Sequence, residues 1–597
     1  MSRGRHDLAR ELERLEDGQL IRALIEMDPS YTFKHNLVQQ VAYQSLLAGD
    51  RRGLHRAVGE TLERLHPEAR HELAEVLASH FEQAGDSARA LEYLDLAGGQ
   101  AMRRFATAEA SALFSRAIEI AGAQVFDPVL LLHLYQQRGR ALELRGDHTS
   151  AMQVYQELEE LGRTHNDPRL QLGGVIGAAS LQAVPTLLFD PAAALANADR
   201  ALSLASQLGD PAGQAKAYWL KMLVQTRLDP RLAVEAGEAS LALARQHGLR
   251  DQEAFTLNDI QANYLVLGEP ERALAALEQA RPIWRELDNL PMLSDNLAST
   301  AMVHAVLGEY DPATERSQEA VALSDRIGNL WGQSYGRISI GLAAFARGEL
   351  GATIREMTRC IEISELAGFL YPQIAMRAML AFAYGFAGDL DTAEELGQKI
   401  RRIEQGSPLP GAASGSATLA WVAARRGDLT GAEVLLQQAG SEPDAMAMAM
   451  GDSPIPLALA ATALQLAKHD YAAALQMAER FSAALERHAW RIVRCPLLLM
   501  RGRALAGLKE WAQAREMLEI ARSEMRVQGV DSGLWEVEAE LATVTRVLGD
   551  PSAASLLASA RQRLLAVAEG LRQAGLSEKF LAQPHIRAIF EEAGPAA

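Results

Sequence analysis

The chain has 597 residues, 48% of them hydrophobic and only 6% aromatic, and 59 Lys and Arg against 76 Asp and Glu give a formal net charge of −17. An acidic chain repels phosphate backbones, so we expect no nucleic-acid partner. Cys360 and Cys495 are too few for a disulfide framework and favour a reducing, cytoplasmic location. The sequence has no run of about 18 apolar residues and shows no signal peptide, so we expect no membrane partner.

The N-terminal segment, residues 1–48, is predicted to be a small helical adaptor. Its leucine spacing predicts a helix from Leu8 to Met27, with apolar positions at Leu8, Leu12, Leu15, Leu20 and Leu24. A turn and a short extended piece around Pro29 precede a second long helix, which we expect to run from about His35 to Leu65. Residues 49–110 are interpreted as a helical junction that ends in a first repeat-like hairpin.

A short pattern recurs along the chain, and residues 111–575 are predicted to consist of repeats of about 40 residues. The pattern is a helix end, Gly with an acidic residue after it, and a new helix start. Gly favours the left-handed conformation that ends a helix, and the acidic residue suits the N-terminus of the next one. From Asp229 onward the copies are 39 to 42 residues apart, a period that random turns would not keep. The glycine copies are Gly85, Gly146, Gly268, Gly308, Gly348, Gly388, Gly427 and Gly549, and degenerate copies fall at Asp190, Asp229, His469 and Lys509.

Small residues keep a fixed distance from these turns, because only small side chains allow two helices to cross closely. Seven residues before the turn stand Ala78, Gly139, Ala301, Gly341, Ala381, Ala420, Gly502 and Ala542, and five after it stand Ala90, Ala151, Ala273, Ala313, Ala393, Ala432, Ala474, Ala514 and Ala554. The pattern resembles the tetratricopeptide repeat, with a period about six residues longer than the family's. The resemblance implies an all-α solenoid, a right-handed superhelix of helix hairpins.

Both ends of the chain carry a second resemblance. The stretch Phe33–Leu47 with the following Arg51-Arg52-Gly53-Leu54-His55, and the terminal Glu578–Phe590, resemble the repeat arm of signal-transducing (STAND) ATPases. That group includes ATPases fused to class III adenylate or guanylate cyclases, and the arm is similar to that of the maltotriose-responsive transcription activator. The resemblance implies that residues 1–48 are a winged-helix remnant and that residues 576–597 are a C-terminal capping helix.

The chain lacks the catalytic modules of that group. The phosphate-binding pattern G-x-x-x-x-G-K-[ST] does not occur, so no loop is available to hold nucleotide phosphates. The cyclase domain is missing as well. We therefore interpret the chain as the repeat arm of such a protein: a natural short relative, a split gene product or a truncated gene model.

Other motifs give no support for an enzyme. Gly332–Gly336 matches G-x-S-x-G, but a nucleophile elbow needs a strand before the serine, and the repeat places helix there. Cys360 falls on a small-residue packing position, and the histidines form no metal-binding spacing. We expect no catalytic residues, no metal and no cofactor.

The first helix of each central hairpin is predicted to line the concave side of the superhelix. The candidate binding surface consists of Asn258, Met302, Tyr335, Leu342, Phe345, Phe382, Phe386 and Trp421. One interpretation is a groove for a peptide, a partner helix or a small ligand. The other, which we weigh more heavily, is a tightly wound superhelix that buries these residues as ordinary core.

Two functions remain open at this stage. The first is a non-catalytic protein-interaction and sensor scaffold with a protein or peptide partner. The alternative is a regulatory arm that senses a small-molecule effector, as part of a split or truncated ATPase–cyclase or transcription regulator.

Overall fold

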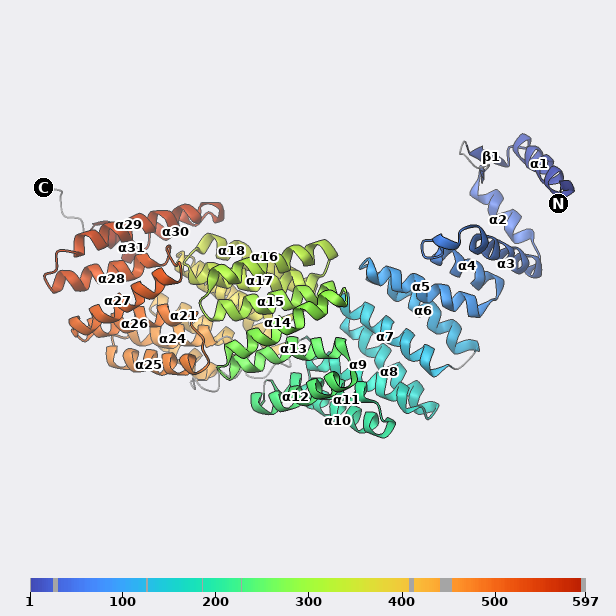
Figure 1. Cartoon of the computed structure of the whole chain (residues 1–597). Coiled ribbons are helices and arrows are strands. Elements are labelled where there is room, and N and C mark those ends of the chain that lie inside the picture. The colour runs from blue at the N-terminus through green and yellow to red at the C-terminus, as the bar shows by residue number, and fades with distance from the viewer. Residues whose placement is uncertain are drawn as a thin grey trace. The chain divides into compact units, whose positions relative to one another are not determined.

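The structure is a computed structural model that describes residues 2–24, 30–124, 127–184, 186–226, 228–406, 413–440 and 454–591. Over these residues the chain is all-α apart from a two-stranded antiparallel hairpin. It divides into two compact units, Met1–Arg138 and Gly139–Ala597, and the boundary falls inside helix α7 (Figure 1). The end of the predicted capping segment, residues 592–597, lies outside the described residues.

The first unit begins with a helix and a β-hairpin and continues as paired helices. In the hairpin Ile21 pairs with Phe33 and Leu24 with Ser30. The elements are α1 Ser2–Asp17, β1 Ile21–Leu24, β2 Ser30–Phe33, α2 Asn36–Ser45, α3 Ala48–Leu65, a 3-10 turn Pro67–Ala69, α4 Ala74–Ala84, α5 Ser87–Arg103, α6 Thr107–Gln124 and α7 Pro128–Leu144.

The structure corrects two helix boundaries that the leucine pattern predicts in this unit. The helix predicted to reach Met27 ends at Asp17, and Leu20 to Leu24 belong to a turn and a strand. Gln19 there has a φ of 61°, which an α-helix does not allow. The helix predicted from His35 to Leu65 is interrupted at Leu46 and Leu47, whose extended backbone separates α2 from α3.

The second unit is a stack of helix hairpins. The elements after α7 are α8 His148–Thr164, α9 Pro168–Ala183, α10 Pro191–Leu208, α11 Pro211–Gln225, α12 Pro230–His247, α13 Arg250–Val266, α14 Pro270–Glu286, α15 Leu290–Val306, α16 Tyr310–Ile327, α17 Leu330–Ala346, α18 Leu350–Leu366, α19 Leu370–Phe386 and α20 Leu390–Gly406. They continue with α21 Ser414–Arg426, α22 Leu429–Ala439, α24 Pro454–Ala467, α25 Tyr471–Arg487, α26 Arg494–Gly507, α27 Trp511–Val527, α28 Leu534–Val547, α29 Ala553–Gly570, a 3-10 turn Arg572–Ala574, α30 Ser577–Leu581 and α31 Pro584–Glu591.

The repeated turn works as its residues predict. Gly146, Gly268, Gly348 and Gly427 all have positive φ angles between 75° and 83°. The aspartate that follows a turn caps the next helix, as where Asp147 accepts a hydrogen bond from the backbone N–H of Ser150 at 3.2 Å.

Small residues allow the close crossing within each hairpin. A Cβ added to Gly341 would lie 2.9 Å from the Met357 side chain, and one added to Gly502 would lie 2.6 Å from Leu518. Ala381, Ala420 and Ala542 are at most 1% exposed. An exception is Ala554, which is exposed, while the neighbouring Ala553 faces the core.

The hairpins of the second unit wind back onto themselves. The last turn of the first helix in a hairpin contacts a loop that belongs to the next winding of the stack. We call this line of contacts the seam. At the seam Arg491 N–H donates to the Val306 carbonyl at 2.8 Å, and Gly533 N–H donates to the Arg347 carbonyl at 2.9 Å. Helices α18 and α29 also pack together (Figure 1). The seam therefore satisfies helix-terminal carbonyls that have no partner within their own helix.

Candidate functional site

The predicted concave surface lies on first helices of the second unit, where the structure encloses it. Asn258, Leu342, Phe382 and Trp421 are buried, and Met302, Tyr335, Phe345 and Phe386 are half-buried. The rings of Phe382 and Trp421 meet edge to face, with centroids 4.6 Å apart. Substituting Trp421 would therefore disturb the core before it tested any partner.

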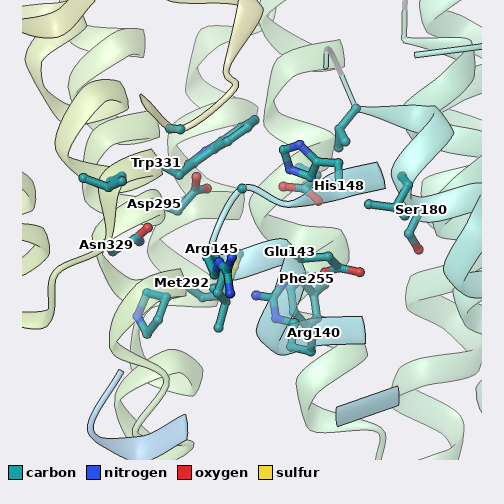
Figure 2. Close-up of a pocket in the computed structure, with 18 of the residues that line it drawn as sticks. Arg140, Glu143, Arg145, His148, Ser180, Phe255, Met292, Asp295, Asn329 and Trp331 are labelled. Atoms are coloured by element: carbon teal, nitrogen blue, oxygen red, sulfur yellow. Dashed lines mark hydrogen bonds and ion pairs between the residues drawn. The ribbon is translucent and has the colours of Figure 1, made fainter. Parts of the chain in front are cut away.

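Asn258 leads to a cavity of about 320 Å³ inside the first winding. Its walls come from the end of α7 and from α9, α11, α13 and α15, and the loops around α17 and α18 close it. Figure 2 shows Arg140, Glu143 and His148 around the same space as Asp295 and Trp331. The cavity is thus surrounded by successive hairpins.

A pair of aspartates forms the polar wall of this cavity. The amide nitrogen Nδ2 of Asn258 donates to Oδ2 of Asp295 at 2.8 Å and to Oδ1 of Asp259 at 3.2 Å. Trp219 Nε1–H donates to the other oxygen of Asp259 at 2.8 Å. Both carboxylates line the cavity, and each keeps partial solvent access.

A second set of amides fixes the orientation of Asn258. Its Oδ1 accepts from Nδ2 of Asn296 at 3.1 Å, and Asn296 also donates to the Leu277 carbonyl at 3.0 Å. Arg281 in turn donates to Oδ1 of Asn296 at 3.0 Å. Because Asn258 is held as an acceptor on one side, its amide hydrogens must point at the two carboxylates.

Burial makes ionisation of the aspartate pair unfavourable. Loss of bulk water raises the pKa of Asp259 to about 6, against the hydrogen bonds from Asn258 and Trp219. The same desolvation, together with the charge of Asp259, raises the pKa of Asp295 to about 7. In the described part of the chain, neither carboxylate has a Lys, Arg or His nitrogen within 4.0 Å.

Aromatic rings form the apolar walls. Trp219 and Phe255 lie with ring centroids 5.9 Å apart, and the Lys216 ammonium sits 5.3 Å from the Trp219 centroid. Burial lowers the pKa of Lys216. Trp331 stacks on Phe369 with ring centroids 3.7 Å apart, so one face of the Trp331 indole is covered.

The wall that α7 contributes is charged but neutralised. Arg140 and Glu143 form an ion pair at 2.9 Å, and the Tyr155 hydroxyl donates to Glu143 at 2.7 Å. Burial lowers the pKa of His148, which also lines the cavity. The other charged residues that line the cavity are Asp259, Asp295 and Arg145, and in the described part of the chain no ion pair joins them.

The seam closes the cavity at one side. Gly146 of the α7–α8 turn lies against the backbone of Ala367, and a Cβ at Gly146 would be 3.1 Å from the Ala367 carbonyl oxygen. Arg145, Gly146 and Ala367 all line the cavity. The seam contact therefore forms part of the cavity wall.

The serine of the G-x-S-x-G match and Cys360 are both buried in helix packing. Ser334, at the centre of the G-x-S-x-G match, is buried inside α17, and its carbonyl accepts from the Cys360 thiol at 3.2 Å. Burial raises the pKa of Cys360 to about 12, so the thiolate is not accessible at neutral pH. Among the described residues no group of three or more His, Cys, Asp and Glu is placed to hold a metal ion. Likewise, none of the helices described is long and apolar enough to cross a bilayer.

The sequence interpretation found Asn258 but missed the aspartates beside it. Asp259 and Asp295 follow Asn258 and Ser294 on first helices that carry several other polar residues. Local polarity alone was therefore no distinctive signal. It could not show that the two carboxylates share one amide, because the contact joins different hairpins.

No protein-family model matches the chain, and no curated protein matches it. Among solved structures it is similar to a Rap protein complexed with competence and sporulation factor, at 14% identity and a TM-score of 0.44, over 58% of this chain and 96% of that one. It is also similar to aspartyl phosphate phosphatase F from Bacillus subtilis, at 12% identity and a TM-score of 0.39, over 57% of this chain and 91% of that one. A STAND protein with a tetratricopeptide repeat sensor from Pyrococcus horikoshii matches at 16% identity and a TM-score of 0.35. The match covers 72% of this chain and 57% of the STAND protein. The fold assignment rests on the helices and contacts of the chain itself.

Proposed function

We propose that the second unit is a non-catalytic sensor scaffold whose first winding binds a small organic cation, an ammonium or guanidinium group on a short chain. One observation carries this proposal: Asp259 and Asp295 share the Asn258 amide in an aromatic-walled cavity, and no Lys, Arg or His nitrogen of the described residues lies within 4.0 Å of either carboxylate. An enclosed carboxylate pair is costly unless a positive charge joins it. A ligand that supplies this charge gains two charge-assisted hydrogen bonds.

The position of the cavity suggests how occupancy is read. A ligand between α13, α15 and the α7–α8 turn touches both sides of the seam at Gly146 and Ala367. Because it favours the closed seam, it shifts the population toward the tightly wound form. We propose that a protein or peptide partner reads that change, in keeping with the resemblance of the sequence to STAND sensor arms.

Calorimetric titration of the whole chain tests the cation site. The probe is agmatine, compared with a neutral analogue of similar size, at pH 8 and pH 5.5. We expect saturable binding of a cationic probe at pH 8 and weaker binding at pH 5.5, because protonation of the pair removes its charge. Asp295→Asn should weaken binding by about ten- to hundred-fold.

Glu235→Gln is the matched control, since Glu235 is an exposed carboxylate on α12 outside the cavity. It should leave the affinity unchanged. Asp259→Asn is a second variant in case the first lowers the yield of folded protein. Equal binding of cationic and neutral probes, or cation binding that survives both aspartate variants, would rule the site out.

A further inference from the structure

A second cavity, of about 400 Å³, lies inside the following winding. First helices α17, α19, α21, α24, α26 and α28 contribute to it, and the C-terminal helices α30 and α31 close it. Its walls are largely apolar, formed by Phe345, Phe386, Leu499, Met500, Met525 and Val537. Two residues of the predicted concave surface, Phe345 and Phe386, therefore belong here and not to the first cavity.

Arg425 gives this cavity its distinctive charge. Its guanidinium lies 5.2 Å from the ring centroid of Trp421 and 5.8 Å from that of Phe386. It donates to the neutral amide oxygen Oε1 of Gln583 at 3.2 Å. The Arg425 side chain is exposed, and over the residues that the structure describes no carboxylate lies within ion-pair distance of it.

The other arginine of the cavity is already satisfied. Arg503 pairs with Glu540 at 2.6 Å and with Glu536 at 3.0 Å. Each of these carboxylates is therefore engaged by Arg503 and neither reaches Arg425. Among the described residues that line the cavity, Arg425 is thus a guanidinium that no carboxylate neutralises, and it lies beside a long apolar wall.

The C-terminal helices hold Arg425 in this place. Gln583 accepts from Arg425 and donates its amide Nε2–H to the Phe386 carbonyl at 2.9 Å. Phe580 and His585 both lie against the Trp535 ring, with centroids 6.2 Å and 6.3 Å away. A molecule in the cavity would lie under this closing segment.

We propose that the second cavity binds a molecule with one carboxylate and an apolar chain. The carboxylate pairs with Arg425, whose planar fork fits two carboxylate oxygens. The chain lies along Met500, Met525 and Leu499, where flexible methionines adapt to its shape. This site is separate from the cation site of the first winding, and either can fail without the other.

Titration of the whole chain with decanoate tests this site, with 1-decanol and decylamine as probes that change only the head group. Tryptophan fluorescence reports occupancy, because Trp421 and Trp535 adjoin the cavity. We expect saturable decanoate binding at least about ten-fold tighter than that of decanol. Arg425→Gln should remove this preference, and Arg425→Lys should keep part of it.

Arg426→Gln is the matched control, because the neighbouring Arg426 pairs with Asp391 and Glu394 and does not line the cavity. It should leave the decanoate affinity unchanged. The carboxylate has two possible sources, a fatty acid or a peptide C-terminus. An apolar hexapeptide with a free C-terminus, compared with its amide, distinguishes them. Absence of decanoate and peptide binding, or equal loss of decanoate and decanol in Arg425→Gln, overturns the proposal.

Discussion

The turns of the second unit fall into two kinds that look alike in sequence. At Gly348 and Gly388 the turn lies against the next winding, and an added Cβ would be 2.6 Å from Gly533 N and 2.9 Å from the Lys579 carbonyl oxygen. At Gly427 and Gly549 an added Cβ would meet nothing within 4 Å. The first kind needs glycine for its backbone and for space, and the second needs it for its backbone alone.

The degenerate copies fit this distinction. Lys509 and His469 take the glycine place with φ angles of 65° and 57°, so both adopt the left-handed conformation that glycine normally supplies. A residue with a side chain tolerates this conformation at a modest cost when it has open space. At these two copies the missing glycine falls at an exposed turn, whereas at the Asp190 copy Phe189 of the turn is buried in the core of later hairpins.

The largest effect is expected from a substitution at the seam. Gly348→Ala adds a methyl group against Gly533, whose N–H donates to the Arg347 carbonyl, and it also strains a φ of 75°. We expect a loss of about 2–4 kcal/mol in the free energy of unfolding. Gly549→Ala strains the same conformation in open space and should lose only about 1–2 kcal/mol.

Urea unfolding followed by circular dichroism measures both variants. Repeat arrays can unfold in steps, so the transition that contains the seam is the one to compare. Equal losses for Gly348→Ala and Gly549→Ala would show that the seam contributes no packing energy.

The aspartate pair beside the seam predicts that the free energy of unfolding depends on pH. The pKa of Asp259 is raised to about 6 and that of Asp295 to about 7, so the folded state binds more protons than the unfolded state between pH 4 and pH 7. The stability contribution of these groups is therefore complete at low pH and is lost as the pH rises through 6 and 7. Asp295→Asn should flatten this decline and should stabilise the chain at pH 8.

Thermal unfolding between pH 4.5 and pH 8 measures this effect. Gly146→Ala sharpens the test, because its Cβ would lie 3.1 Å from the Ala367 carbonyl oxygen and the seam beside the cavity must shift; we expect the decline to move toward the ordinary aspartate range. A decline that is unchanged in Asp295→Asn would mean that other groups cause it.

The local physics of the repeat was predictable from sequence, and its long-range consequences were not. Turn glycines, capping aspartates and the alanines at the crossing act within one hairpin, so their spacing identified the solenoid. The seam joins residues such as Val266 and His488, which lie 222 positions apart, and no local pattern records that pairing. The same holds for the Asp259–Asp295 pair and for Arg425, whose partner Gln583 lies 158 positions away.

A smaller effect is expected at the C-terminal end of the seam. Gln583→Ala removes the hydrogen bond to the Phe386 carbonyl and leaves Arg425 without its amide partner. We expect a loss of about 1–2 kcal/mol, and faster hydrogen exchange in α30 and α31. Exchange that is unchanged there would mean that other contacts, such as those of Phe580 and Ile586, hold the closing helices without Gln583.

The smallest effect is expected at an uncovered turn, and its sign is opposite. Lys509→Gly relieves the left-handed strain without removing a seam contact, so it should raise the free energy of unfolding by about 0.5–1 kcal/mol. His469→Gly should gain less, because the His469 ring bonds the Tyr471 hydroxyl at 2.9 Å. Urea unfolding of the two variants ranks them. If Lys509→Gly destabilises the chain, the lysine must hold a contact that outweighs its strain, and open space would not explain why this turn tolerates a side chain.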